Sequence, residues 1–348
     1  MKYIIDQKRE EQSHNANGKA MSDVFKILFS CGVKLVPGIS KDKSKIIRIL
    51  DFPILVFFCM FKAKKGDYIF YVFKENILKI KIVNLLRKVK GYKTICFIYD
   101  VNSIREGISN AVATEFALIS AADVILAPNE GSIKYMKDLN IDKPMIPVKV
   151  WDYLIEESSI GNEADMDCKE ISNGVLHVAY AGNFGKSAFI RELGKSQVVS
   201  DKVVYHLWGD IDDEHFFDNY SNVVYEGSVS PRELIAEIGK KCDAGLVWDG
   251  EKATEIAGLY GEYMKFNNPH KCGCYLAAGL PVIVWSKSGA AYFVRESGCG
   301  WCIDSLSDID VIARNIDKTV YAATAEVSEK VRKGMYLREA VLTATKGM

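Results

Sequence analysis

The residues best suited to chemistry lie in one stretch, KFNNPHKCGCYLAAGLPVIVW, which spans residues 265–285. Asn267, Asn268 and Lys271 stand where a polar loop enters a helix, because apolar residues return at helical spacing after them. The free N–H groups of a helix start favour a phosphate, and a lysine one turn in adds a full charge. The stretch predicts an anion site followed by a buried strand, Val282–Trp285, although a capped turn explains the same letters.

A second glycine-bearing loop follows the expected strand Val175–Tyr180. It contains Gly182, Asn183 and Lys186, and the chain is expected to open a helix there. Backbone N–H groups of such a loop can turn toward an anion. Two residues separate its glycines where a complete Walker A motif has four, so it indicates a phosphate loop of another kind.

A carboxylate follows the continuous apolar strand expected at Lys93–Tyr99. Asp100 at the end of a central strand is well placed for acid–base work, with Arg105 shortly after it. Capping of the following turn is an equally simple role for an aspartate. An earlier polar loop, residues 12–20, holds Asn15 and Lys19 and follows the first expected strand, at the edge where doubly wound sheets bind ligands.

The run from Lys271 to Val282, KCGCYLAAGLPV, resembles the donor-binding segment of bacterial GT-B glycosyltransferases. That segment has a lysine, two residues, a glutamate and then YLA-x-G-x-P-V. The NNPHK start is most similar to galactofuranosyltransferases and to related glucosyltransferases that build surface polysaccharides and adhesin glycans. Cys274 departs from the pattern, because it stands where many relatives carry a glutamate that holds the donor ribose.

The resemblance implies an α/β protein of the GT-B fold, with two Rossmann-like domains facing a cleft. It implies a UDP-sugar donor, a glycan or lipid-linked saccharide acceptor, and a hexose, galactofuranose or glucose, as the group transferred. Lys271 would neutralise the diphosphate in place of a metal, so neither metal nor cofactor is expected. Asp100 would be the base of an inverting reaction. The donor side would comprise Gly182, Asn183, Lys186, Gly227, Asn267, Asn268 and Lys271, and the acceptor side Asn15, Lys19 and Arg105.

Two other functions remain open at this stage. A nucleotide-sugar epimerase or similar sugar-modifying enzyme would bind the same donor without an acceptor. A non-catalytic subunit that assists a glycosyltransferase would keep the fold and lose the chemistry. Cys274 and Tyr99 favour that second alternative, because Tyr99 replaces a histidine common in related enzymes, whereas Lys271 and Asp100 argue against it.

The charge distribution is asymmetric although the 348-residue chain is neutral overall. Residues 1–150 carry 25 Lys and Arg against 15 Asp and Glu, and the remainder carries 20 against 30. With no nucleic-acid motif beside it, this excess indicates either a membrane surface as partner or a generally basic solvated face. The basic amphipathic helix expected at Ile77–Val89 allows both. The apolar run Ile54–Phe61 is too short to span a bilayer and is expected to be a buried helix.

The nine cysteines are odd in number and scattered, which indicates reduced thiols and a cytoplasmic protein. Cys272 and Cys274 lie two apart on an expected helix and diverge by about 200°, so packing explains them better than zinc. Assembly into a homo-oligomer is left open.

Strands and helices alternate through both halves, which predicts two Rossmann-like domains. The expected organisation is an acceptor domain at 1–150, a linker at 151–173, a donor domain at 174–318 and a C-terminal helix at 319–348 that returns to the first domain. Ser230, Pro231 and Glu233 predict a capped helix start after Gly227, and capping alone also explains that segment. Asp249–Tyr263 is expected to be a long loop, and Val320–Leu342 a single helix.

Overall fold

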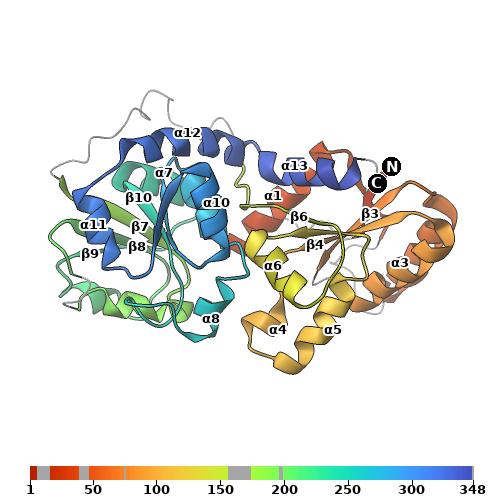
Figure 1. Ribbon diagram of the computed structural model, residues 1–348, viewed down its shortest axis with the longest axis horizontal. Coiled ribbons are helices and arrows are strands. Elements are labelled where there is room, and N and C mark those ends of the chain that lie inside the picture. The colour runs from red at the N-terminus through yellow and green to blue at the C-terminus, as the bar shows by residue number, and fades with distance from the viewer. Residues whose placement is uncertain (6–15, 39–46, 74–75, 156–173, 196–198, 347–348) are drawn as a thin grey trace. The chain divides into compact units, whose positions relative to one another are not determined.

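The computed structural model describes residues 1–5, 16–38, 47–73, 76–155, 174–195 and 199–346. The chain divides into two compact units, each with its own parallel sheet (Figure 1). Unit 1 contains residues 1–12, 24–148 and 337–348, and unit 2 contains residues 13–23 and 149–336. The predicted α/β class with two Rossmann-like sheets is confirmed.

The sheet of unit 1 is wholly parallel and has the strand order β2-β1-β3-β4-β5-β6. Its central strands are continuous apolar runs because helices cover both faces. The order reverses between β1 and β3. The strands are β1 (Lys2–Ile4), β2 (Val33–Leu35), β3 (Tyr68–Phe73), β4 (Lys93–Ile98), β5 (Val124–Ala127) and β6 (Met145–Pro147).

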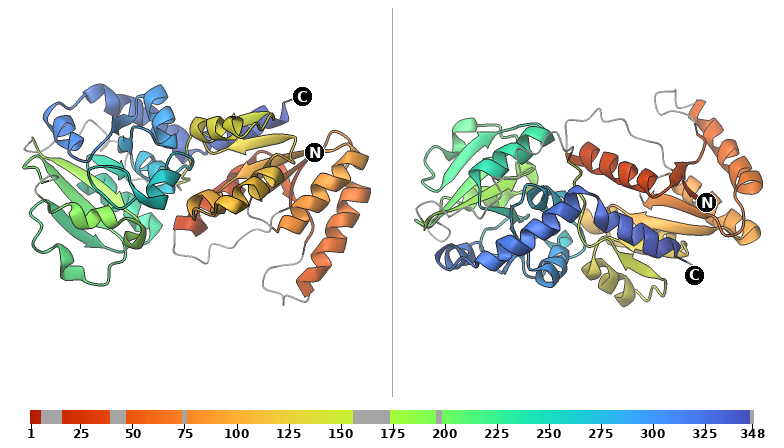
Figure 2. Two further views of the ribbon diagram at one scale, coloured as in Figure 1. Left: turned by 60° about the horizontal axis from the view of Figure 1, so that its bottom comes forward. Right: turned by 90° about the horizontal axis from the view of Figure 1, so that it is seen from above.

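Several short helices and turns flank this sheet, and α2, its π-helical continuation η2 and α3 run side by side (Figure 2). The helices are α1 (Ala16–Ser30), whose residues 16–23 belong to unit 2, the 3-10 helix η1 (Ile47–Leu50), α2 (Asp51–Phe57), η2 (Phe58–Lys62), α3 (Ile77–Lys90), α4 (Asn102–Arg105), α5 (Ser109–Ile119), α6 (Glu130–Asp138) and α13 (Met335–Thr345), whose first two residues belong to unit 2. Among the described residues, no helix is long and apolar enough to cross a bilayer.

The sheet of unit 2 is also parallel, with the order β12-β11-β10-β7-β8-β9. Numbered from its own first strand this is the 3-2-1-4-5-6 order of dinucleotide-binding folds, and it reverses between β7 and β10. The strands are β7 (Leu176–Ala181), β8 (Val203–Trp208), β9 (Val223–Gly227), β10 (Ala244–Val247), β11 (Val282–Trp285) and β12 (Gly300–Ile303).

Two helices of unit 2 carry predicted donor residues: the 3-10 helix η6 (Phe184–Lys186) contains Lys186 and α9 (His270–Ala277) contains Lys271. The other helices of the unit are the 3-10 helices η7 (Ala188–Glu192) and η8 (Glu214–Phe217), and the α-helices α7 (Pro231–Lys241), α8 (Gly258–Tyr263), α10 (Gly289–Ser297), α11 (Asp308–Arg314) and α12 (Lys318–Arg332).

The predicted cap after Gly227 is confirmed, and a second local feature of unit 2 is a left-handed glycine. Helix α7 begins with a capping box, in which the Ser230 side chain accepts from the Glu233 N–H and Glu233 accepts from the Ser230 N–H at 3.0 Å. Helix α9 is followed by Gly279 with φ of 83°, the left-handed conformation that glycine adopts without strain. Both features depend on neighbours in the sequence alone.

Three expected elements differ from the structure. Helix α1 begins at Ala16, so the expected loop at residues 12–20 is helical in its second half. The expected loop Asp249–Tyr263 ends in the short helix α8. The expected single helix Val320–Leu342 is two helices, because Gly334 adopts φ of 71° between α12 and α13.

The expected burial of the apolar run Ile54–Phe61 is wrong for its outer side. Leu55, Phe58 and Cys59 are buried, whereas Phe57 is 55% and Phe61 is 69% exposed. Hydropathy of the run could not distinguish its two sides, because both are apolar.

Candidate functional site

The strongest candidate site lies in unit 2, at the carboxyl ends of β7 and β10. These two strands are paired, and the strand order of the sheet reverses between them. Ligands of open α/β sheets bind at such a reversal, because the loops leaving the two strands diverge to opposite faces. The chain leaves β7 through Gly182 and leaves β10 through Trp248 and Asp249.

Lys271, in the first turn of α9, extends its ammonium group to this reversal. Its Nζ lies 2.8 Å from Asp249 Oδ1 and donates to the Tyr180 hydroxyl at 3.0 Å. A longer contact of 3.4 Å joins it to the Trp248 carbonyl. The Lys271 side chain is only 14% exposed, so the ion pair with Asp249 offsets the loss of water.

Tyr180 and Ser187 complete this cluster from the β7 side. The Tyr180 hydroxyl donates to Ser187 Oγ, which donates to Asp249 Oδ1 at 3.1 Å. Burial, with the negative charge of Asp249, raises the pKa of the Tyr180 hydroxyl well above its ordinary value. Tyr180 is therefore a protonated donor, and four polar side chains hold one another in place.

The backbone of the β7 loop passes directly beside Lys271. A Cβ at Gly182 would lie 3.4 Å from Lys271 Nζ and 3.2 Å from the Tyr180 hydroxyl. The loop is fixed from below because Ala181 N–H donates to the Tyr275 hydroxyl of α9 at 2.7 Å. No side chain stands between the Gly182 backbone and the Lys271 ammonium. An anionic ligand could therefore contact the backbone N–H groups and the cation together.

The expected helix after Gly182 is not an α-helix. Residues 184–186 and 188–192 form two 3-10 helices, η6 and η7, because Ser187 between them points inward to Tyr180 and Asp249. Asn183 is exposed and caps η6 by accepting from the Gly185 N–H at 2.9 Å. The side chain of Lys186 lies outside the described residues.

The start of α9 contributes a second polar group, His270. No described residue hydrogen-bonds to its Nε2, which is buried although the ring is partly accessible. The ring packs on Tyr153 with centroids 5.1 Å apart. Burial, with the positive charge of Lys19, lowers the pKa of His270 to about 3, so the imidazole is neutral at physiological pH. Asn267 and Asn268 are half-buried just before it.

Lys19, an expected acceptor residue, lies within unit 2 beside this group. Its Nζ forms an ion pair with Asp23, donates to the Leu154 carbonyl at 2.8 Å and lies 4.4 Å from the centre of the Tyr153 ring. Cys274, at the position of the family glutamate, is buried near Tyr153, and burial raises the pKa of its thiol to about 12. It is a packed, protonated thiol.

Asp100 and Arg105, predicted separately as base and acceptor residue, are brought together in unit 1. They form an ion pair after β4, and Arg105 also donates to Asn102 Oδ1 at 2.9 Å and Glu106 Oε1 at 3.0 Å. The Asp100 side chain is 14% exposed. The guanidinium engages one carboxylate oxygen of Asp100, so proton transfer through that oxygen would require Arg105 to move.

The remaining predicted residues lie apart from the Lys271 cluster or outside the described part. Gly227 ends β9 with φ of 83°. A Cβ added at this position would have no described atom within 4 Å. Asn15 lies outside the described residues. Most of the expected linker, residues 156–173, also lies outside them.

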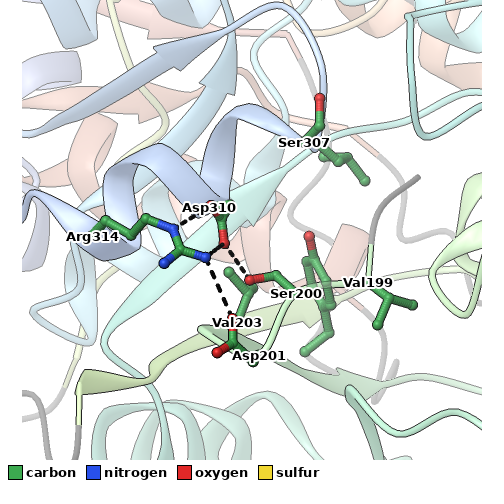
Figure 3. A pocket seen from close by; sticks show the side chains of 9 residues that line it. Val199, Ser200, Asp201, Val203, Ser307, Asp310 and Arg314 are labelled. Atoms are coloured by element: carbon green, nitrogen blue, oxygen red, sulfur yellow. Dashed lines mark hydrogen bonds and ion pairs between the residues drawn. The ribbon is translucent and has the colours of Figure 1, made fainter. Parts of the chain in front are cut away.

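A cavity of about 350 Å³ lies at the opposite edge of the same sheet, where β8 begins at Val203 (Figure 3). Its charged groups are paired with one another, since Arg314 joins Asp310 at 2.6 Å and Asp201 at 3.4 Å. It lies at the amino edge of the strands, away from the reversal, and is the weaker candidate. Among the described residues, no group of three His, Cys, Asp or Glu side chains could hold a metal ion.

Two models of one family match consecutive parts of the chain. The N-terminal domain described as glucosyltransferase 3-like matches residues 2–150, and the C-terminal domain of the same description matches residues 178–344. The chain belongs to the glucosyltransferase 3-like family. It is a glycosyltransferase, as the KCGCYLAAGLPV segment predicts.

Curated relatives carry glycosyltransferase names. Beta-1,6-galactofuranosyltransferase WbbI of Escherichia coli strain K12 is 25% identical over 74% of this chain and 73% of its own. Glucosyltransferase 3 of Streptococcus parasanguinis is 24% identical over 73% and 71%. Glucosyltransferase 3 of Streptococcus gordonii is 40% identical over a shorter part, 34% of this chain and 33% of its own.

Solved glycosyltransferases share the fold at low identity. Sucrose-phosphate synthase of Thermosynechococcus elongatus has a TM-score of 0.58 at 13% identity and covers 99% of both chains. Anabaena HepE in complex with UDP and glucose has a TM-score of 0.50 at 13% identity, over 99% of this chain and 96% of its own. A trehalose-6-phosphate synthase studied for glycosyltransfer with retention has 0.50 at 12%, over 85% and 77%. The fold is GT-B, as predicted.

Two residues of the Lys271 cluster were missed from the sequence, Tyr180 and Asp249, whereas Ser187 closes the predicted glycine-bearing loop. Tyr180 ends the expected strand Val175–Tyr180 and Asp249 begins the expected loop Asp249–Tyr263, and both positions were a usable signal. Their meeting depends on β7 and β10 being neighbours, and the strand order is not written in either segment.

Proposed function

We propose that this glycosyltransferase moves a hexose, galactofuranose or glucose, from a UDP-sugar to a glycan or lipid-linked saccharide, with inversion and without a metal ion. The galactofuranosyltransferase and glucosyltransferase relatives support these two sugars. HepE, which shares the fold, was solved with UDP and glucose. The acceptor class follows from the resemblance to enzymes of surface polysaccharides and adhesin glycans.

One observation supports the donor half of the proposal. At the reversal of the unit 2 sheet, Lys271 Nζ lies 3.4 Å from the point that a Cβ on Gly182 would occupy, so the backbone of the loop directly faces the ammonium group. In this proposal the diphosphate lies over the Gly182 backbone. Lys271, oriented by Asp249 and Tyr180, stabilises the charge that develops on the β-phosphate as the C1–O bond breaks. The start of α9, where the His270 Nε2 has no described partner, adds a neutral donor or acceptor.

The acceptor half of the proposal uses Asp100. Its carboxylate takes the proton of the acceptor hydroxyl while that oxygen forms a bond to C1 of the sugar and UDP departs. One displacement with one base inverts the anomeric centre. Arg105 holds Asp100 and is proposed to line the acceptor side.

Calorimetric titration with UDP in the presence of a chelator tests the donor half. The wild type is expected to bind, and Lys271→Ala is expected to lose about a hundredfold in affinity, since charge-assisted contacts to phosphate contribute about 1.5–3 kcal/mol each. Lys287→Ala is the matched control, because Lys287 is an exposed lysine of the same unit. Absence of wild-type binding at millimolar UDP, or equal binding by Lys271→Ala, contradicts the donor assignment.

The stereochemistry is tested separately. Wild-type enzyme is incubated with UDP-galactofuranose or UDP-glucose and a saccharide acceptor, and the anomeric configuration of the product is read by NMR. A product with the donor configuration contradicts the inverting role of Asp100 and leaves the donor site intact.

A further inference from the structure

The outer faces of three consecutive helical segments in unit 1 expose large apolar side chains. Phe61 is 69% and Val89 is 76% exposed, and large apolar side chains exposed as a group mark an interaction surface. The first segment is η1 together with α2, the second is η2 and the third is α3. The exposed apolar side chains are Ile49, Leu50, Val56, Phe57, Phe61, Ile77, Leu78, Leu85 and Val89.

These segments cover the same face of the unit 1 sheet. Phe58 of η2 packs edge-on against Tyr3 of β1, with ring centroids 4.9 Å apart. Asn84 of α3 donates to the Tyr71 hydroxyl of β3 at 3.2 Å. Tyr3 pairs with Ile69, two residues before Tyr71, so Tyr3 and Tyr71 point to one face. Because the helices also pack against each other, their outer sides form one surface.

This surface, called the α2–α3 face from here, is basic as well as apolar. Between residues 49 and 93, the described carboxylates are Asp51 and Asp67. Both are buried and paired, Asp51 with Lys79 at 3.0 Å and Asp67 with the N-terminal amine. The exposed cations of the same span are Lys62, Lys64, Lys65, Lys81 and Lys88.

We propose that the α2–α3 face docks this protein onto an anionic lipid surface. Phe57 and Phe61, whose rings lie 5.0 Å apart, and the aliphatic side chains enter the headgroup boundary, while the lysines contact lipid phosphates. Exposed apolar groups mixed with cations, and with no exposed carboxylate among the described residues of the 49–93 span, complement an anionic bilayer. The inference stands independently of the proposed donor chemistry.

A second copy of the chain is the rival occupant. Two copies joined through this face would bring five exposed lysines of each together, with no described exposed carboxylate of the 49–93 span to pair them. Like charges at an apolar interface oppose association, so charge complementarity favours lipid. A self-associating face is therefore treated as an outcome of the test.

The test is sedimentation of the full chain with vesicles of phosphatidylcholine, alone or mixed equally with phosphatidylglycerol. The wild type is expected to bind the mixed vesicles and not the neutral ones, and to be released by salt. Phe57→Ser with Phe61→Ser is expected to weaken binding at least about tenfold, because two exposed rings leave the lipid boundary. Lys62→Glu with Lys64→Glu and Lys65→Glu is expected to weaken it on the order of a hundredfold.

Matched controls come from exposed residues of unit 2. Leu259→Ser with Val311→Ser removes exposed apolar groups, and Lys287→Glu with Lys318→Glu and Lys330→Glu makes the same charge change. Both controls are expected to bind vesicles as the wild type does. Thermal unfolding and circular dichroism verify that each variant is folded.

Three results overturn the proposal. The first is a wild type that does not bind the mixed vesicles. The second is wild-type binding by the Phe57→Ser, Phe61→Ser variant, or an equal loss in the unit 2 controls. The third is analytical ultracentrifugation in which the wild type is a dimer and the Phe57→Ser, Phe61→Ser variant is a monomer, while both bind vesicles equally. The face would then join two copies of the chain.

Discussion

Unit 1 and unit 2 carry similar sheets but differ at the point where the strand order reverses. In unit 2, Tyr180, Asp249 and Lys271 form a cluster there whose members hydrogen-bond to one another. In unit 1 the reversal lies between β1 and β3, and the described pair Asp100–Arg105 follows β4 instead. Both ion pairs are partly exposed, at 14% and 21% for Lys271 and Asp249 and at 26% and 14% for Arg105 and Asp100, so the units differ in where the pair lies in the sheet and not in its exposure.

Substitution of the unit 1 carboxylate is expected to have the largest effect and to separate the roles of the two units. Asp100→Asn should lower the rate of transfer about a thousandfold, because the amide cannot accept the acceptor proton. UDP affinity should remain that of the wild type, since the donor groups lie in unit 2. Initial rates and calorimetry measure the two quantities.

Glu106→Gln is the matched control, because Glu106 contacts the same Arg105 but is exposed. Its rate should stay within a few-fold of the wild type. Asp100→Asn with more than a tenth of wild-type activity would show that unit 1 does not supply the base.

The fixed cluster of unit 2 can be broken and partly restored. Lys271→Met should lower the free energy of unfolding by about 2 kcal/mol, because Asp249 keeps a partly buried charge without its partner. Lys271→Met with Asp249→Leu should recover most of that loss without recovering UDP binding. Urea unfolding of both variants makes the measurement. A double variant no more stable than Lys271→Met would mean that the pair is not a coupled unit.

Acid should destabilise unit 2 through His270. Its folded pKa, about 3, lies below the ordinary value because burial and the charge of Lys19 disfavour the protonated ring. The neutral ring is therefore favoured in the folded state, and stability falls as pH drops from about 6.5 toward 3. The loss in the free energy of unfolding should be at most about 2 kcal/mol at pH 5, because the partly accessible ring keeps some contact with water.

His270→Gln should remove this acid sensitivity, as urea midpoints at pH 7.5 and pH 5 would reveal. His215→Gln is the control, because His215 is exposed in the same unit. Equal acid sensitivity in wild type and His270→Gln would contradict the burial of a neutral imidazole.

Two helix caps give the smallest effects and compare the units directly. Asn129 caps α6 in unit 1 and is buried with its partner Ser132, whereas Ser230 caps α7 in unit 2 near the surface. Ser230→Ala should cost about 1 kcal/mol and Asn129→Ala about 2 kcal/mol, because burial leaves the freed N–H groups without water. Thermal midpoints of the two variants test the order, and the reverse order would contradict it.

Features that depend on neighbours in the chain were accessible from the sequence. The capping box at Ser230, the left-handed Gly279 and the α9 start beside Lys271 are all formed by residues within a few positions of one another. The alternation of strands and helices predicted two Rossmann-like domains. The resemblance of the KCGCYLAAGLPV run to the donor-binding segment of known enzymes implied the GT-B fold and the family.

Features that join distant segments were not accessible in this way. Tyr180 and Lys271 are 91 positions apart, and their contact exists because β7 and β10 are neighbours and α9 returns beneath them. Phe57 and Phe61 belong to an apolar run whose hydropathy indicated burial, but only the packing of η2 on Tyr3 decided which side meets water.

The sequence by itself thus determined the alternation of strands and helices and the helix caps, since these depend on short-range backbone chemistry, and the resemblance of one segment implied the family and Lys271 as a donor candidate. The tertiary structure alone decided that Asp249, Tyr180 and Ser187 surround Lys271, that Asp100 is held by Arg105, and that a basic apolar face is exposed. Strand order and helix orientation depend on the total apolar surface that a whole unit buries, and a short segment of sequence does not reveal that total.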